Sequence, residues 1–136
     1  MNNTEYTAYI DGASSGNPGI SGIGILIYKN SELIYEASKN IGYATNNIAE
    51  YTALLELLKV AIEKNIKEIK IFSDSELLCR QISGEYKIKN TKLKEILKKI
   101  LELKKNINFE LVHISNENNK KADKLAKKAS KNQSIK

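Results

Sequence analysis

The sequence predicts an α/β fold in which a five-stranded mixed sheet is flanked by helices. Three β-prone runs follow one another in the first third of the chain, and two more come later, separated by helical segments. Strands joined by short turns pair antiparallel, whereas strands separated by helices add in parallel through right-handed crossovers. We therefore expect three antiparallel strands and then two parallel ones, in a single domain over residues 1–136.

The first three strands are marked by β-prone residues with turn-forming residues between them. Tyr6–Ile10 is a short strand that ends at Asp11, and the turn-rich stretch Gly12–Gly19 follows it. Gly22–Tyr28 and Leu33–Ala37 then form a hairpin. These strands make the antiparallel part of the sheet.

The middle of the chain alternates between helix and strand. Ile48–Glu63 is the clearest helix, because apolar residues recur there at helical spacing. That stripe consists of Tyr51, Leu54, Leu55, Leu58 and Ile62. Glu68–Phe72 is a short strand, and Ser73-Asp74-Ser75 provides a start for a helix over Glu76–Ile82.

The last part of the chain repeats the pattern of helix, strand and helix. Thr91–Lys104 is amphipathic, with lysines opposite its apolar face, and Asn108–Ile114 is the fifth strand. A last helix covers Asn119–Lys131, with a small inner face formed by Ala122, Leu125, Ala126 and Ala129. The polar tail over residues 131–136 is expected to fray.

Composition limits the class of protein. With 41% hydrophobic and 28% charged residues, the chain is typical of a globular protein. Its apolar runs are too short to span a membrane, and its first residues lack the features of a signal peptide. Cys79 is the only cysteine, so no internal disulfide can form, and the reducing cytoplasm is the expected location.

The net charge of +6 is unevenly distributed. Residues 1–79 contain six basic and ten acidic residues, a net charge of −4, while residues 80–136 contain sixteen basic and six acidic residues, a net charge of +10. Such a division suits a protein that holds cations and binds a polyanion. Lysines on solvated helices would give the same division, and charge alone does not separate the two interpretations.

Four acidic residues carry the strongest functional signal: Asp11, Glu50, Asp74 and Asp123. Each lies beside a predicted strand end or on a helix face expected to turn inward, and active sites in such sheets gather at the carboxyl ends of strands. Gathered carboxylates raise each other's pKa unless a cation lies among them. Hard oxygen ligands suit Mg²⁺ or Mn²⁺, so the four residues together predict a metal-dependent phosphoryl-transfer site.

Each carboxylate also has an ordinary structural explanation. Asp11 could start a turn, and Asp74 could cap the helix after it. If Asn47 is the N-cap of its helix, Glu50 is the N3 residue of an arrangement close to a capping box. Asp123 could compensate a helix dipole. Each of these explanations is good for one residue alone, but the four residues on this order of strands and helices favour a metal site.

The segments around these carboxylates resemble ribonuclease HI. They are Tyr9-Ile-Asp-Gly-Ala-Ser-Ser-Gly-Asn-Pro-Gly19, Thr45-Asn-Asn-Ile-Ala-Glu50-Tyr51, Phe72-Ser-Asp-Ser75 and Asn119-Lys-Lys-Ala-Asp123-Lys-Leu-Ala126. The similarity runs from about Tyr6 to Ala129, with the segments in the order of the family. It implies the ribonuclease H-like fold, and it makes the four acidic residues the family's metal-holding and catalytic carboxylates.

The resemblance implies an endoribonuclease that hydrolyses the RNA strand of RNA–DNA hybrids and leaves 5′-phosphate and 3′-hydroxyl ends. Two Mg²⁺ ions, or Mn²⁺ in their place, would activate the attacking water and stabilise the leaving oxygen. Asp11 is the expected bridging ligand, because it comes from the central strand. The residues expected to contact the hybrid are Gly12, Ser14, Asn17, Asn46, Asn47 and Ser75.

His113 is the only histidine and lies ten residues before Asp123. A histidine at matching spacing assists proton transfer or product release in ribonuclease HI, so the resemblance makes His113 a catalytic residue; a structural role at a strand end is the alternative. Two features depart from the family. Glu76 stands where the family often has a non-acidic residue, and only residues 84–90 join the second and third helices, as in the branch without a basic handle.

A non-catalytic or differently specific nucleic-acid-binding protein on the same fold is the main alternative. The loss of any one carboxylate would favour it, and none is lost. A nucleotide-binding protein that uses Gly12–Gly19 as a phosphate cradle is disfavoured, because the loop does not end in Gly-Lys-Ser or Gly-Lys-Thr. We expect a monomer that needs no obligate protein partner and does not associate with membranes.

Overall fold

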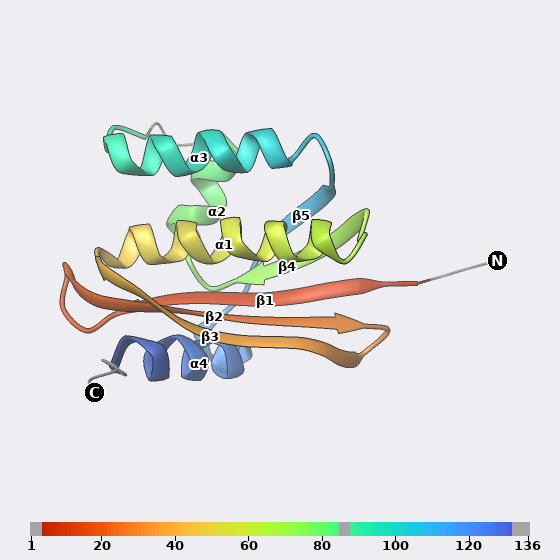
Figure 1. Ribbon diagram of the computed structural model, residues 1–136, viewed down its shortest axis with the longest axis horizontal. Helices are drawn as coiled ribbons and strands as arrows, with labels where there is room; N and C mark the ends of the chain where they lie inside the picture. Colours follow the sequence, from red (N-terminus) through yellow and green to blue (C-terminus); the bar gives the residue numbers. More distant parts are fainter. Residues whose placement is uncertain (1–3, 85–87, 132–136) are drawn as a thin grey trace.

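The computed structural model describes residues 4–84 and 88–131, and it contains one sheet between two layers of helices (Figure 1). The strands are β1 (Tyr6–Ser14), β2 (Gly19–Lys29), β3 (Glu32–Ala44), β4 (Glu68–Ser73) and β5 (Asn108–His113). The helices are α1 (Asn46–Glu63), α2 (Glu76–Ile82), α3 (Thr91–Leu103), the short 3-10 helix η1 (Asn116–Asn119) and α4 (Lys120–Lys131).

The strand order in the sheet is β3-β2-β1-β4-β5, so β1 lies at its centre. β1, β2 and β3 form an antiparallel meander. β4 pairs in parallel with β1, and β5 pairs in parallel with β4. The predicted mixed sheet, antiparallel first and parallel afterwards, is therefore confirmed.

The two faces of the sheet are covered by different kinds of helix. α1 lies along one face with α2 and α3 outside it, and α4 lies along the opposite face (Figure 1). The core on the α1 side is made of large apolar side chains that are almost completely buried, among them Ile10, Ile25, Tyr51, Leu54, Leu58 and Ile71. α4 buries only small residues against the sheet, namely Ala122, Ala126, Ala129 and Ser130.

β1, β2 and β3 each extend several residues beyond the prediction, and β2 covers Gly19–Lys29 where Gly22–Tyr28 was predicted. β1 continues past Asp11 to Ser14, because it stays paired with β2 as far as Ser21. Asp11 therefore lies inside a strand and not at its end, which corrects the prediction. β3 runs on to Ala44, although the prediction ended it at Ala37. Pairing with a neighbouring strand satisfies backbone groups in these glycine- and serine-containing stretches, whose own propensity for β structure is low.

The N-caps of two helices are not the residues that the sequence suggested. Thr45 caps α1 by accepting a hydrogen bond from the backbone N–H of Ile48, so Glu50 is not part of a capping box headed by Asn47. Ser75 caps α2 in the same way, with its side chain accepting from the N–H of Leu78, so Asp74 is not the cap. Neither carboxylate is needed to start its helix.

The end of the chain differs slightly from the prediction. α4 begins at Lys120, because η1 occupies the preceding residues, and Lys131 belongs to the helix and not to a frayed tail. The rest of the predicted tail, residues 132–136, and residues 85–87 of the predicted short connection lie outside the described residues. Within the described ranges, no helix has both the length and the apolar character needed to cross a membrane.

Candidate metal centre

Three of the four predicted carboxylates come together beside the central strand. Asp11, Glu50 and Asp74 each place one carboxylate oxygen within 4.8 Å of the oxygens of the other two. They come from β1, from α1 and from the residue directly after β4. Asp11 is only 6% exposed, and the other two side chains are half-buried. Residues far apart in the sequence thus form one acidic group.

The parallel pairing of β1 with β4 brings Asp11 and Asp74 to the same level. Tyr9 in β1 pairs with Phe72 in β4, and each carboxylate comes two residues later along the chain, Asp11 within β1 and Asp74 directly after β4. Parallel strands run in the same direction, so equal steps from one pair lead to neighbouring positions. The position of Asp74 therefore follows from the register of the sheet.

A glycine in β1 lets α1 approach the sheet and places Glu50. A Cβ atom on Gly12 would lie 2.5 Å from the carbonyl carbon of Ala49, which is too close for any side chain. Glu50 is the next residue in α1, so this contact brings its carboxylate to Asp11. The Ser75 side chain hydrogen-bonds to the Glu50 carboxylate.

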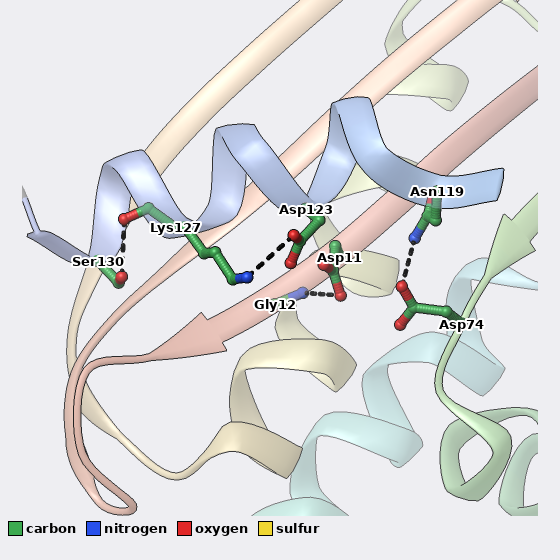
Figure 2. A network of polar contacts seen from close by, with 7 residues as sticks. All are labelled: Asp11, Gly12, Asp74, Asn119, Asp123, Lys127 and Ser130. Carbon is green, nitrogen blue, oxygen red and sulfur yellow. Dashed lines mark hydrogen bonds and ion pairs between the residues drawn. The ribbon is translucent and has the colours of Figure 1, made fainter. Parts of the chain in front are cut away.

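A second glycine does the same for α4 on the opposite face. Gly24 is the partner of Asp11 in the pairing of β1 with β2. A Cβ atom on Gly24 would lie 2.3 Å from the carbonyl oxygen of Ala122. Asp123 follows Ala122, and its carboxylate lies beside that of Asp11 (Figure 2). Asp123 is not in the group of three, and one of its oxygens is 3.1 Å from Nζ of Lys127.

Burial and mutual repulsion raise the pKa values of the gathered carboxyl groups. Burial is the largest cause for Asp11, followed by the negative charge of Asp74. Hydrogen bonding with Asp123 and the charge of Glu50 add to these causes, and the pKa of Asp11 rises to about 9. Burial also raises the pKa of Glu50 to about 7, although the hydrogen bond with Ser75 opposes the rise.

Asn119 holds the third carboxylate of the group. Its Nδ2 donates to Oδ2 of Asp74 at 3.2 Å, as Figure 2 shows, and to the carbonyl oxygen of Ile10 at 2.9 Å. Burial raises the pKa of Asp74, and the hydrogen bond from Asn119 is the largest of the effects that lower it. The charge of His113 lowers this pKa as well.

A divalent cation fits this group of side chains. Carboxylate oxygens are the ligands that Mg²⁺ and Mn²⁺ prefer, and here three of them can reach one point. Burial first, and the neighbouring negative charges after it, raise the pKa values of Asp11 and Glu50, so ionising both groups without a cation is unfavourable. A bound cation would supply the missing positive charge and stabilise the ionised carboxylates.

The carboxylates line an open cleft of about 740 Å³. Lysines of α4 form part of its wall, namely Lys120, Lys127 and Lys131. The cleft therefore combines an acidic centre with a basic border. This pairing matches the expectation from the uneven distribution of charge along the sequence.

Three of the six residues predicted to contact nucleic acid line this cleft, and the other three lie next to residues that line it. Gly12, Ser14 and Asn46 line it. Asn17 and Asn47 are exposed, and Oδ1 of Asn17 accepts a hydrogen bond of 3.0 Å from the backbone N–H of Asn46. This bond ties the loop after β1 to the first residue of α1. The sixth residue, Ser75, is the N-cap of α2. All six nucleic-acid contacts stay predictions.

His113 lies at the edge of the site. It is exposed at the end of β5, opposite Ser73 in β4, and it is not among the residues that line the cleft. Its effect on the pKa of Asp74 places it within electrostatic reach of the carboxylates. Its catalytic role stays a prediction. Glu76 forms a 2.9 Å ion pair with Arg80 one turn further along α2.

Sequence reasoning assigned no role of its own to Asn119. It is the first residue of the predicted last helix, yet its side chain is buried and contacts Asp74. Asn119 lies four positions before Asp123, and residues at that spacing share one face of a helix. This spacing is the signal that could have connected Asn119 with the carboxylates.

Known proteins are similar to this chain in sequence and in fold. A family model described as reverse transcriptase-like matches residues 9–129. Ribonuclease HI of Halobacterium salinarum is 34% identical over 124 residues, an alignment that covers 90% of this chain and 62% of that protein. Ribonuclease H of Prosthecochloris aestuarii is 36% identical over 140 residues, covering 91% of this chain and 94% of that one. The crystal structure of LC11-RNase H1 in complex with an RNA/DNA hybrid has a TM-score of 0.87 and 37% identity, covering 93% and 97% of the two chains.

The fold and the matched segments define a reverse transcriptase-like domain with an acidic centre. Within that class, the chain belongs to the ribonuclease H family. This confirms the resemblance to ribonuclease HI and the predicted ribonuclease H-like fold. The chain spans 62% of the length of the Halobacterium relative and 34% of the length of three mycobacterial relatives.

Proposed function

We propose that this protein is a metal-dependent endoribonuclease that hydrolyses the RNA strand of RNA–DNA hybrids, leaving 5′-phosphate and 3′-hydroxyl ends. The observation that carries the proposal is the convergence of Asp11, Glu50 and Asp74, whose oxygens lie within 4.8 Å of one another. Membership of the ribonuclease H family supports it. The related RNase H1 that was crystallised with an RNA/DNA hybrid supports the choice of substrate.

Four side chains would hold two Mg²⁺ ions, for which Mn²⁺ could substitute. Glu50 and Asp74 would share one ion with Asp11, because these three carboxylates are grouped. Asp123, which lies beside Asp11 on the other face, would share the second ion with it. When bound, the ions would activate the attacking water and stabilise the leaving 3′-oxygen. Asp11 is thus our candidate for the bridging ligand.

Other groups of the chain would orient the substrate. The amides of Asn17 and Asn47 and the backbone of the Gly12–Gly19 loop would read the 2′-hydroxyl groups that distinguish RNA from DNA. Oδ1 of Asn17 already accepts a hydrogen bond, so this side chain would offer its NH₂ group to a hydroxyl. The lysines of the cleft wall would contact phosphates, and affinity should fall as salt concentration rises.

One cleavage assay tests the proposal. The protein is incubated with end-labelled RNA–DNA hybrid, double-stranded RNA and double-stranded DNA, each with Mg²⁺, with Mn²⁺ or with a chelator. We expect cleavage in the RNA strand of the hybrid, dependent on metal, with 5′-phosphate ends. Replacing the 2′-hydroxyls around the cut site by hydrogen should stop it.

Two other outcomes would contradict the proposal. Equal cleavage of the all-DNA duplex would make the protein a general nuclease. Binding of the hybrid without cleavage would indicate the non-catalytic alternative. A monomer located in the reducing cytoplasm stays our prediction from the composition.

A further inference from the structure

Asn119 connects three elements of the metal centre through a single amide group. It is the last residue of η1, directly before α4, and its side chain is 1% exposed. Its Nδ2 donates to the carbonyl oxygen of Ile10, the residue before Asp11 in β1, and to Oδ2 of Asp74 after β4. Asp123 lies one turn further along the same segment. One side chain therefore contacts the Asp74 carboxylate and the backbone next to Asp11, and the residue lies one turn before Asp123.

The orientation of this amide follows from its surroundings. Both partners of Nδ2 are acceptors, so a flipped amide would set its oxygen against two other oxygens. In the orientation present, both hydrogens of the NH₂ group are used. The arrangement is therefore specific for a side chain that donates twice.

Packing alone does not explain an asparagine at this position. Its Oδ1 is buried and has no hydrogen-bond partner among the described residues. A buried polar atom without a partner costs free energy, whereas a leucine, which has the same number of non-hydrogen side-chain atoms, would bury no such atom. The residue is explained if the two hydrogen bonds of its nitrogen have a function that outweighs this cost.

We propose that Asn119 is a positioning residue that fixes the orientation of the Asp74 carboxylate and ties the start of α4 to β1, so that the carboxylates are arranged for the metal before it binds. The inference rests on the proposed function, because it gives Asn119 a part in metal binding. Loss of a hydrogen-bond partner that orients a metal ligand typically weakens metal affinity by about 10–100-fold.

The test is the affinity of the protein for Mg²⁺ alone, measured by calorimetry without nucleic acid. Asn119→Ala should weaken this affinity by about 10–100-fold. Asn119→Leu keeps the branching and the number of non-hydrogen atoms of the side chain but cannot donate, so it should show the same loss of affinity, and circular dichroism checks that the variant is folded. In an Asp74→Asn background, removing Asn119 should have little further effect, because the residue acts through Asp74.

The chain offers a matched control on the same helix. Oγ of Ser38 in β3 donates to the carbonyl oxygen of Leu125 at 2.7 Å, which ties α4 to the sheet without touching a carboxylate. Ser38→Ala should therefore bind Mg²⁺ with the affinity of the wild type. A role of Asn119 in tethering α4 alone would produce similar losses in both variants.

A measurement on the unmodified protein complements the variants. In the ¹⁵N-labelled protein, the side-chain NH₂ signals of Asn119 should shift when Mg²⁺ is added, because the carboxylate they contact would bind the ion. The NH₂ group of Asn40, which donates to the carbonyl oxygen of Ala129 in α4, is the internal reference and should shift less.

The outcomes separate this inference from the function on which it rests. If the wild type binds Mg²⁺ and cleaves hybrid while both Asn119 variants bind Mg²⁺ equally well, the inference is wrong and the function stands. An equal loss in Ser38→Ala, or Asn119 NH₂ signals that do not respond to Mg²⁺, would also overturn it. If the wild type neither binds Mg²⁺ nor cleaves hybrid, the proposed function fails and the inference falls with it.

Discussion

The two faces of the sheet bring a carboxylate to Asp11 by the same contact. On each face a strand glycine presses against the backbone of a helix alanine, and the carboxylate is the next residue of that helix. The two sets are Gly12, Ala49 and Glu50 on the α1 face, and Gly24, Ala122 and Asp123 on the α4 face. Since a Cβ atom would not fit at either glycine, both helices lie closer to the sheet than ordinary side chains allow.

The faces differ in what holds the helix in place. α1 is held against the sheet by the burial of its own large apolar side chains, such as Leu54 and Leu58. Fully burying one such side chain typically contributes about 1.5–3 kcal/mol to the stability of the fold. α4 has an inner face of alanines, and hydrogen bonds from Ser38 and Asn40 in β3 tie it to the sheet. A change on the α1 face should therefore alter both the stability of the fold and the geometry of the site. A change on the α4 face should alter the geometry of the site with a smaller loss of stability.

Asp11 belongs to both arrangements, so its loss should have the largest effect. Asp11→Asn should reduce hybrid cleavage on the order of 10³-fold or more, because the residue that both metal ions would share loses its charge. The fold and hybrid binding should persist, since the side-chain volume hardly changes. Steady-state rates and a binding assay check this, with Asp74→Asn expected to behave alike. Near-normal turnover in both variants would refute the two-metal interpretation.

On the α1 face, Gly12→Ala should be severely destabilising. The new Cβ would lie 2.5 Å from the backbone of Ala49, and α1 cannot retreat without opening the core. We expect the free energy of unfolding to fall by about 3 kcal/mol or more, measured by urea denaturation. A loss below about 1 kcal/mol would show that α1 is not held as tightly as the burial of its leucines suggests.

On the α4 face, Gly24→Ala should damage the site more than the fold. Its Cβ would lie 2.3 Å from the carbonyl oxygen of Ala122, but α4 can move outward because little apolar surface holds it. We expect a loss of about 1–3 kcal/mol in stability, together with strongly reduced cleavage, because Asp123 moves away from Asp11. The same denaturation and cleavage assays serve for both glycine variants. Unimpaired cleavage, or a loss of stability as large as in Gly12→Ala, would contradict the contrast between the faces.

The gathered carboxyl groups should make the metal-free protein less stable as pH rises. The pKa values of Asp11 and Glu50 in the folded state, about 9 and about 7, lie above their ordinary values of 3.8 and 4.5. The native state therefore binds more protons than the unfolded state, and stability falls from about pH 4 upward through pH 7 to 9.

The melting temperature tests this dependence on pH. At pH 8, Asp11→Asn should melt higher than the metal-free wild type, by roughly 3–6 °C, and the difference should vanish near pH 4. Adding Mg²⁺ at pH 8 should stabilise the wild type more than the variant. A wild-type melting temperature that rises from pH 5 to pH 8 in step with that of the variant would contradict the raised pKa values.

His113→Ala should have the smallest effect of these changes. The side chain lies at the edge of the site and could carry protons near neutral pH. Because the metal ions would already supply the nucleophile and stabilise the leaving group, we expect a loss of about tenfold, below the usual range of about 10²–10⁴ for an acid–base residue. Rates for the wild type and the variant between pH 6 and 9 check this. An unchanged rate and pH profile would make His113 a structural strand-end residue.

The sequence could predict the parts of this structure that depend on local patterns. The helical stripe of α1 and the alternation of helix and strand after it predicted the mixed sheet, with antiparallel strands first and parallel strands afterwards. The four carboxylates were found from their places beside predicted strand ends and on helix faces. The N-caps that would have explained Glu50 and Asp74 structurally are not formed, since Thr45 caps α1 and Ser75 caps α2. Thr, Ser, Asn and Asp are all suitable N-cap residues, so residue type alone left these alternatives open.

The contacts that assemble the site could not be read from one segment at a time. The places where glycines admit α1 and α4 depend on which strand residue faces which helix turn. The extension of β1 beyond Asp11 depends on pairing with β2. The double hydrogen bond of Asn119 joins residues from three elements, so the sequence alone shows only an asparagine at the start of the predicted last helix.

The most direct test of the central claim is to locate the metal ions themselves. Crystals of the wild-type protein would be grown with Mn²⁺ and a hybrid whose RNA strand carries 2′-deoxy sugars at the cut site, and the anomalous signal of Mn²⁺ would be measured. We predict two peaks about 4 Å apart that both contact Asp11, one also reached by Glu50 and Asp74 and the other by Asp123. Peaks remote from Asp11, or no peak in this cleft, would contradict the claim.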